Sequence, residues 1–234
     1  ELVLLAPMKA ELPPEVFTRL FEPPKSDGNG FDRDNLLKAS KLLDDAGWVL
    51  KNRLRVNVKT GKPLSFELLI ASGANDQWVL PFKKNLARLG VTMNIRQVDI
   101  AQLTNRKRSR DYDMMQTLWA AQPWPSSDLQ ISWASGYIDS SYNAPGVKSP
   151  VIDALIAKIV AAQGDKEKLL PLGRALDRVL TWNYYMLPMW YMGEDRVARW
   201  DKFSLPAVRP VYTLGFDTWW YDVNKAAKLP AARR

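Results

Sequence analysis

Neither cysteine nor histidine occurs among the 234 residues of this chain. Without cysteine, the chain can supply no thiol nucleophile, disulfide bond, cysteine zinc site or iron–sulfur ligand. Without histidine, it can supply no Ser-His-Asp triad, no imidazole base and none of the commonest transition-metal ligand. Catalysis by this chain is therefore restricted to paired carboxylates, a lysine nucleophile or a Ser-Lys pair.

Long apolar runs and phosphate-binding loops are also missing. No stretch of 18 apolar residues is present, so we expect no membrane-spanning helix. The opening Glu1–Leu5 lacks the basic start and the small-residue cleavage site of a signal peptide, and its abrupt apolar character indicates a portion of a longer protein. Gly28 and Gly30 have no preceding strand and no following Lys-Ser/Thr pair, which argues against a phosphate loop.

Acidic residues are fewer than basic ones, 25 against 33, which gives a formal net charge of +8. A basic balance is typical of proteins that bind nucleic acid or anionic membranes. Here the excess is spread along the chain, and its densest group is Arg106–Arg110. We interpret this group as a solvated helix end and expect no nucleic-acid partner. Salt-dependent retention on DNA would favour the alternative, a basic nucleic-acid module.

Periodicity and turn residues divide the chain into three parts. Residues 1–31 are rich in proline and end in a Gly-rich turn, which predicts extended connecting chain. Residues 32–203 are predicted to form an α/β lobe, and residues 204–234, with strand character over 211–223, a C-terminal segment. Within the lobe we expect helices over 32–46, 75–89, 100–108, 150–163 and 165–181, and strands over 54–58, 64–71, 91–98, 112–119, 185–191 and 195–200. The first two strands read as a hairpin. The alternation over 64–119 is typical of a mostly parallel sheet flanked by helices.

The loop after the strand at 112–119 is the candidate binding site. Ligands of open α/β sheets lie at the carboxyl ends of the strands, and this strand ends at Trp119. The following loop adds Gln122, Trp124 and Asp128. Flat rings, an amide and a carboxylate suit a polar, flexible ligand with apolar side groups. The alternative is a packed surface loop stiffened by proline. Trp133, Tyr137 and Tyr142 follow closely, and such rings can hold sugars, bases or peptide side chains.

Pairs of carboxylates suited to catalysis are scarce. Glu11 and Glu15 have helical spacing but lie in a proline-broken region. Asp111 and Asp113 flank Tyr112 in a predicted strand. Neither pair fits a glycosidase. We therefore expect no enzyme, no cofactor and no metal. Turnover of a glycoside or an ester would favour the alternative, a carboxylate-dependent hydrolase.

Five segments resemble, in order and spacing, the C-terminal half of family 5 extracellular solute-binding proteins. They are Leu42–Trp48, Asn85–Asp99, Asp111–Trp119, Lys148–Ile156 and Leu187–Tyr191. Each motif is weak alone, and their order over residues 32–200 carries the likeness. Glu15–Pro24 and Gln122–Ser127 further resemble a subgroup of that family that binds peptides and peptide-like antibiotics.

The resemblance implies a two-lobed, monomeric binding protein that closes on its ligand by hinge motion. Residues 32–203 would form a periplasmic-binding-protein-like lobe, and residues 204–234 would return to the other lobe. The implied function is the substrate-binding component of an ABC transporter. It would capture oligopeptides or peptide-like compounds in the periplasm for an inner-membrane permease. Carbohydrate or another solute on the same scaffold is the alternative.

We predict that Trp119, Gln122, Trp124 and Asp128 bind the ligand, with Gln116 behind them. The resemblance bears on two of these positions. In oligopeptide binders of this family, an aspartate three residues after the equivalent of Trp119 holds the amino terminus of the peptide. An arginine three residues before that Trp assists in some members. This chain has Gln122 and Gln116 at those positions. An amide still accepts a hydrogen bond from an ammonium group, but without charge assistance, so Asp128 is a second candidate for that role.

Overall fold

The computed structural model describes residues 1–71, 76–119, 124–191, 193–211 and 213–230. The chain separates into an N-terminal unit, Glu1–Met186, and a C-terminal unit, Leu187–Arg234. The predicted boundaries at 31 and 203 remain predictions. No helix among the described ranges is long and apolar enough to cross a bilayer.

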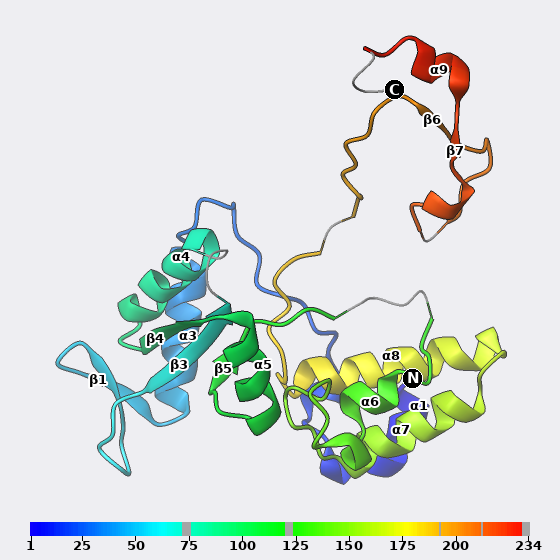
Figure 1. The fold of residues 1–234 in the computed structure, drawn as a ribbon. Helices are drawn as coiled ribbons and strands as arrows, with labels where there is room; N and C mark the ends of the chain where they lie inside the picture. The colour runs from blue at the N-terminus through cyan, green and yellow to red at the C-terminus, as the bar shows by residue number, and fades with distance from the viewer. Residues whose placement is uncertain (72–75, 120–123, 192, 212, 231–234) are drawn as a thin grey trace. The chain divides into compact units, whose positions relative to one another are not determined.

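A three-stranded parallel sheet lies in the N-terminal unit (Figure 1). Its order is β4 (Thr92–Val98), β3 (Ser65–Ala71), β5 (Met114–Met115), with Ser65 opposite Thr92 and Leu68 opposite Met114. The helices α4 (Asp76–Arg88) and α5 (Ile100–Ser109) make the two crossovers. This arrangement confirms the predicted β-α-β-α-β order. The strand predicted over 112–119 is wrong in length, because only Met114 and Met115 pair with β3.

The core of this sheet comes from its central strand. Leu68, Leu69 and Ile70 are all buried in succession, as expected where both faces of a parallel strand are covered. Leu68 and Ile70 pack with Val79 of α4 and Met93 of β4. The apolar face of α4 therefore lies against the sheet.

The only antiparallel hairpin of the N-terminal unit's described residues joins β1 (Trp48–Lys51) to β2 (Leu54–Asn57). The hairpin predicted between 54–58 and 64–71 forms only next to its turn, where Val56 bridges Pro63 and the Leu64 N–H donates to the Arg55 carbonyl at 2.7 Å. It is wrong for the remainder, because β3 pairs with β4 and β5 instead. The turn residues Asn52 and Arg53 have φ values of 49° and 66°, the left-handed pair that a two-residue hairpin requires. The turn contains no glycine, so no turn signal is visible at this point of the sequence.

Helix α3 (Arg33–Asp45) precedes the hairpin and confirms the predicted helix over 32–46. The side chain of Asp32 accepts a hydrogen bond from the Asn35 backbone N–H at 2.8 Å, which caps the first turn. Gly47, at φ +81°, ends the helix in the left-handed conformation that glycine adopts without strain.

A helical cluster forms the second core of the N-terminal unit. It contains α7 (Pro150–Ala161) and α8 (Lys166–Trp182), which pack together, and the short α6 (Leu129–Trp133), which packs on α7 and is followed by the 3₁₀ turn η2 (Ser135–Tyr137). Both long helices confirm their predictions. Members of this core include Ile152, Leu155, Ile156, Ile159, Leu172, Leu176, Val179 and Trp182.

The first residues of the chain join this helical core. They form α1 (Leu2–Leu5), the 3₁₀ helix η1 (Ala6–Glu11) and α2 (Glu15–Thr18), and both α1 and α2 contact α8. Extended chain was predicted over 1–31. That prediction is wrong up to Thr18, because Leu5 and Val16 are fully buried in the core. Residues 19–31 contain no helix or strand. The prolines indicated extended chain, and the apolar residues of these short helices are too few to form a recognisable helical pattern.

The C-terminal unit has little regular structure in its described residues. β6 (Phe203–Ser204) pairs antiparallel with β7 (Trp220–Tyr221), and η3 (Phe216–Thr218) and α9 (Val223–Ala227) complete it. The strands predicted over 185–191 and 195–200 are absent from the described chain, and that over 211–223 is reduced to Trp220–Tyr221. A strand needs a neighbour to receive its backbone hydrogen bonds, and this unit supplies only two short ones.

Candidate functional site

The end of β5 leads into the predicted binding loop. The backbone N–H of Gln116 donates to the Leu69 carbonyl at 3.3 Å, a bond that belongs to the Leu69–Met115 pairing and fixes Gln116 at the end of β5. The Gln116 side chain is half-buried. Trp119, three residues further, is 37% exposed and stacks on Trp133 of α6, with ring centroids 5.7 Å apart and an interplanar angle of 10°. Trp133 is itself buried and gives Trp119 a fixed support.

Beyond this point, Gln122 lies outside the described residues. Trp124 is 38% exposed, and the Lys166 ammonium lies 5.4 Å from its ring centroid. A cation at that distance from an indole is attracted by the ring and places a positive charge beside it. Trp124 therefore presents a flat apolar surface bordered by a cation.

Asp128 stands at the N-cap position of α6, but its carboxylate caps no helix N–H. Its backbone N–H donates to the Ser126 hydroxyl at 3.3 Å, and the residue is exposed. The carboxylate is accordingly available to solvent or ligand. Among the described residues of the site, no hydrogen bond or ring contact joins Gln116, Trp119, Trp124 and Asp128 to one another. The structure attaches Trp119 to α6 and Trp124 to α8, which the sequence could not specify.

Asn143, next to the predicted aromatic stretch, has a structural role. Its side chain is fully buried, donating to the Val147 carbonyl at 3.0 Å and accepting from the Val147 N–H at 2.8 Å. The Arg110 guanidinium donates to the carbonyls of Asn143 and Ala144 at 3.0 and 3.1 Å, and the Tyr112 hydroxyl donates to Ala144 at 2.7 Å. Burial raises the pKa of Tyr112. These bonds fasten the loop before α7 to the end of α5.

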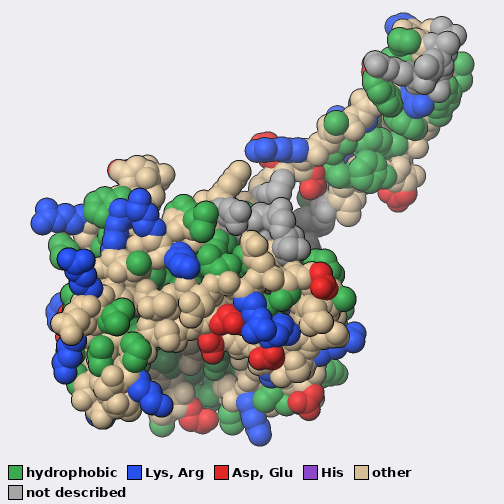
Figure 2. Space-filling view, turned by 60° about the vertical axis from the view of Figure 1, so that its left-hand side comes forward, with side chains coloured by type: hydrophobic (Ala, Val, Ile, Leu, Met, Phe, Trp, Pro, Cys, Tyr) green, Lys and Arg blue, Asp and Glu red, His purple; other side chains and the backbone are tan. Residues whose placement is uncertain are grey.

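The same contacts account for the basic group at 106–110. Arg110 is engaged with the loop carbonyls, and Arg106 pairs with Asp111. Figure 2 shows Lys and Arg side chains scattered among neutral and acidic ones on the face in view. The interpretation as a helix end is confirmed, because Arg106–Arg108 form the last turn of α5, but Arg106 and Arg110 are engaged in contacts and are not simply solvated.

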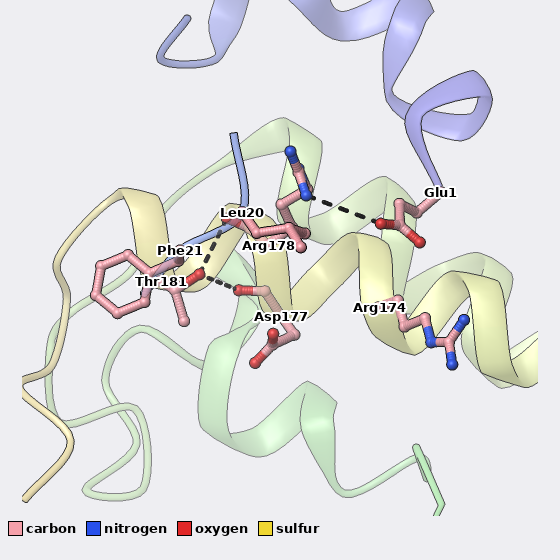
Figure 3. A pocket seen from close by; sticks show the side chains of 7 residues that line it. All are labelled: Glu1, Leu20, Phe21, Arg174, Asp177, Arg178 and Thr181. Carbon is pink, nitrogen blue, oxygen red and sulfur yellow. Dashed lines mark hydrogen bonds and ion pairs between the residues drawn. The ribbon is translucent and has the colours of Figure 1, made fainter. Parts of the chain in front are cut away.

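A cavity of about 420 Å³ lies elsewhere in the N-terminal unit (Figure 3). Its wall is made by Glu1, Leu20, Phe21, Arg174, Asp177, Arg178 and Thr181. Arg178 is buried, donates to the carbonyl of Val16 and to that of Arg19 at 2.7 Å, and lies 3.8 Å from the Glu1 carboxylate. It therefore fastens the start of the chain to α8. Sequence reasoning missed this cavity because its two halves are more than 150 residues apart.

Asp177 is the titratable group of interest in this wall. Burial raises the pKa of its carboxyl, although more than a third of the residue's surface is exposed. No group of His, Cys, Asp and Glu with metal-binding geometry occurs in the described part of the chain.

The parallel sheet, its crossover helices and an aromatic loop at a strand end are features of a solute-binding lobe. The model of the bacterial extracellular solute-binding proteins, family 5 (middle), matches residues 10–141, and the chain belongs to this family. The resemblance seen in the motifs is confirmed.

Among relatives, the chain is 73% identical over its whole length to the Escherichia coli protein YejA, described as uncharacterized, and covers 39% of it. It is 39% identical, over 94% of this chain, to a probable peptide-binding protein YejA of Agrobacterium fabrum, and covers 36% of that protein. A peptidoglycan-binding protein YepA of the same organism is 32% identical over 94% of this chain and is covered to 36%. The chain thus spans less than two-fifths of the length of these relatives.

Solved structures share the fold. AppA of Bacillus subtilis, an oligopeptide-binding protein in complex with a nonapeptide, matches 78% of this chain and 37% of its own, with a TM-score of 0.56 and 18% identity. A periplasmic oligopeptide-binding protein of Thermotoga maritima with bound mannohexaose matches 68% of this chain and 31% of its own, with a TM-score of 0.57 and 19% identity. The predicted α/β binding-protein lobe is confirmed.

Proposed function

We propose that this chain forms part of the substrate-binding component of an ABC transporter, which captures oligopeptides or peptide-like compounds in the periplasm and delivers them to an inner-membrane permease. The observation that carries the proposal is the pair of half-exposed indoles, Trp119 and Trp124, beyond the carboxyl end of β5 in a family 5 lobe. A relative at 39% identity is described as a probable peptide-binding protein, which supports the peptide class.

The side chains around these indoles suit a zwitterionic ligand. The Asp128 carboxylate makes no capping bond and can accept from an ammonium group. The Lys166 ammonium, beside Trp124, can meet a carboxylate. Stacking on the two indoles would bind apolar side chains with little loss of conformational freedom. Each of these acts on binding alone, and we propose that the chain is not an enzyme.

The C-terminal unit supports a two-lobed arrangement. Val208 and Val211 are each more than four-fifths exposed, which is unusual for large apolar side chains so close together in one segment. We propose that residues 204–234 complete a second lobe formed by chain that the relatives possess beyond the matched region. Residues 32–203 would then be the lobe that moves on closure, in a monomer.

The first experiment is native mass spectrometry of the complete protein that carries this chain, purified without denaturation. Adducts of peptide mass, released by gentle activation, would support the proposal and identify the ligands. The protein is then mixed separately with synthetic tripeptides, with neutral oligosaccharides and with peptidoglycan fragments. Binding of oligosaccharides alone would overturn the peptide assignment. Binding of peptidoglycan fragments alone would restrict the ligand to peptides that are attached to sugars.

A substitution then tests the site. Trp124→Ala should weaken binding of the retained ligand by about 30-fold, the usual cost of removing a central indole anchor, without lowering Tm. Phe31→Ala is a matched control, since Phe31 is also a half-exposed ring with a cation, Arg88, 4.5 Å from its centroid. Equal affinity for both variants would remove Trp124 from the site.

A further inference from the structure

Gly173 lies inside α8, where glycine weakens a helix relative to alanine. Its φ is not positive, so the backbone does not require glycine. Of the other described glycines without a positive φ, Gly136 has no atom within 4 Å of a built Cβ, and Gly193 has none closer than 3.9 Å. Gly173 therefore needs a different explanation from the turn glycines.

The explanation is the approach of the candidate binding loop. A Cβ on Gly173 would lie 2.5 Å from Cγ of Pro125 and 3.6 Å from its Cβ and Cδ. Ordinary carbon–carbon contact is about 3.5–4 Å, so an alanine would force the proline ring away by about 1 Å. The absence of a side chain at Gly173 is thus what lets Pro125 rest directly on the helix backbone.

Two further contacts hold the same loop against α8 and against the turn between α7 and α8. The Gln163 side chain, held by its bond to the Ile159 carbonyl at 2.8 Å, also donates to the Pro125 carbonyl at 3.3 Å. Lys166 lies over the ring of Trp124. Pro125 has a fixed φ and follows Trp124 directly, so a displacement of its ring is passed to the neighbouring indole.

We propose that Gly173 is a positioning residue of the binding site: it sets the height of Trp124 above α8 by admitting Pro125 against the helix. The expected effect on ligand affinity rests on the proposed function. The effect on the position of Trp124 rests only on the contact between Gly173 and Pro125. Gly173 touches no ligand. It acts through Pro125. Because that contact is close, ligand specificity depends on Gly173, although this residue lies on the far side of the loop.

The test uses the complete protein labelled with 5-fluorotryptophan, with the Trp124 resonance assigned from a Trp124→Phe variant. Gly173→Ala should shift the Trp124 fluorine resonance, leave that of Trp48 in place, and weaken binding of synthetic tripeptides about tenfold. Pro125→Ala removes Cγ and with it the clash. In the double variant, Gly173→Ala should therefore add nothing to the effect of Pro125→Ala, a non-additivity expected only for residues in contact.

Leu170→Ala, at an exposed position of the same helix, is the control and should leave the resonance and the affinity unchanged. If Gly173→Ala fails to fold, Gln163→Ala, which releases the second anchor, should move the same resonance. An unmoved Trp124 resonance, or additive effects in the double variant, would overturn the role of Gly173. Wild-type protein that binds no tripeptide would instead refute the peptide proposal, while the fluorine measurement would still decide the positioning role.

Discussion

Arg55 shows how much one side chain can hold together. It is 2% exposed and donates to the carbonyls of Leu89 and Trp48 at 2.8 and 2.9 Å, as well as to Asp44 and Ser40. Its guanidinium thereby links the β1–β2 hairpin to α3 and to the end of α4. A planar, multidentate donor is suited to such a site, and lysine would not replace it.

Arg55→Ala should lower the free energy of unfolding by about 3 kcal/mol, because several partly buried acceptors lose their donor together. The partner Asp44 is half-exposed and can recover solvation, which keeps the expected loss below that of a fully buried pair. Urea denaturation checks the value, with Lys51→Ala as the exposed control on β1. A loss under about 1 kcal/mol would show that water takes over the hydrogen bonds that Arg55 donates.

Asp177 predicts a pH dependence. Since burial raises its pKa, the folded chain holds this proton more tightly than the unfolded chain does. The contribution of Asp177 to stability is therefore full below the ordinary carboxyl pKa and declines as pH rises through the raised value. Asp177→Asn should remove that decline, so its Tm relative to wild type should increase from pH 3 to pH 7. A difference independent of pH would show that the carboxyl titrates normally.

At the scale of elements, helix α7 tests whether a capping side chain or a proline determines where a helix begins. The Ser149 hydroxyl accepts from the Ile152 N–H at 3.4 Å, and Pro150 occupies the first turn. The bond is long, so Ser149→Ala should cost about 0.5–1 kcal/mol, at the lower end for an N-cap. Chemical denaturation measures this, with Ser127→Ala, an exposed serine, as the control. An effect equal to that of the control would show that Pro150 alone determines the helix start.

Helices were predicted from the sequence more accurately than strands for a physical reason. Asp32, Asp165 and Gly47 act on backbone groups within a few residues, so the pattern itself contains the signal for a helix boundary. Strand pairing depends on distant partners. The alternation at 54–58 was recognised correctly, but its partner β1 was missed and β3 was chosen in its place.

The candidate site shows the same difference between what nearby residues determine and what distant contacts determine. The identity of the candidate side chains followed from the end of β5 and from the resemblance, and their roles remain predictions. What the sequence could not provide are the supports: Trp133 under Trp119, and Gly173 under Pro125. Both contacts join segments that have no shared periodicity, and a glycine in a helix reads only as a weak position.

For the whole molecule, burial is concentrated in one unit. Both hydrophobic clusters lie within residues 1–186, whereas the described residues of 187–234 that are buried are Gly215 and Ala226. We therefore expect a fragment of residues 1–186 to unfold cooperatively and a fragment of 187–234 to be unfolded, because isolated two-residue strands are not stable in water. Circular dichroism with heating tests both. Cooperative unfolding of the shorter fragment would contradict this division.

The bond between Arg178 and the start of the chain has a mechanical consequence. Glu1 lies beside Arg178, and Tyr185 and Met186 pack on the same helical core, so the first and last residues of the N-terminal unit both lie near the C-terminal part of α8. A unit whose two ends lie together can be carried within a loop of a host domain without interrupting the host's own core.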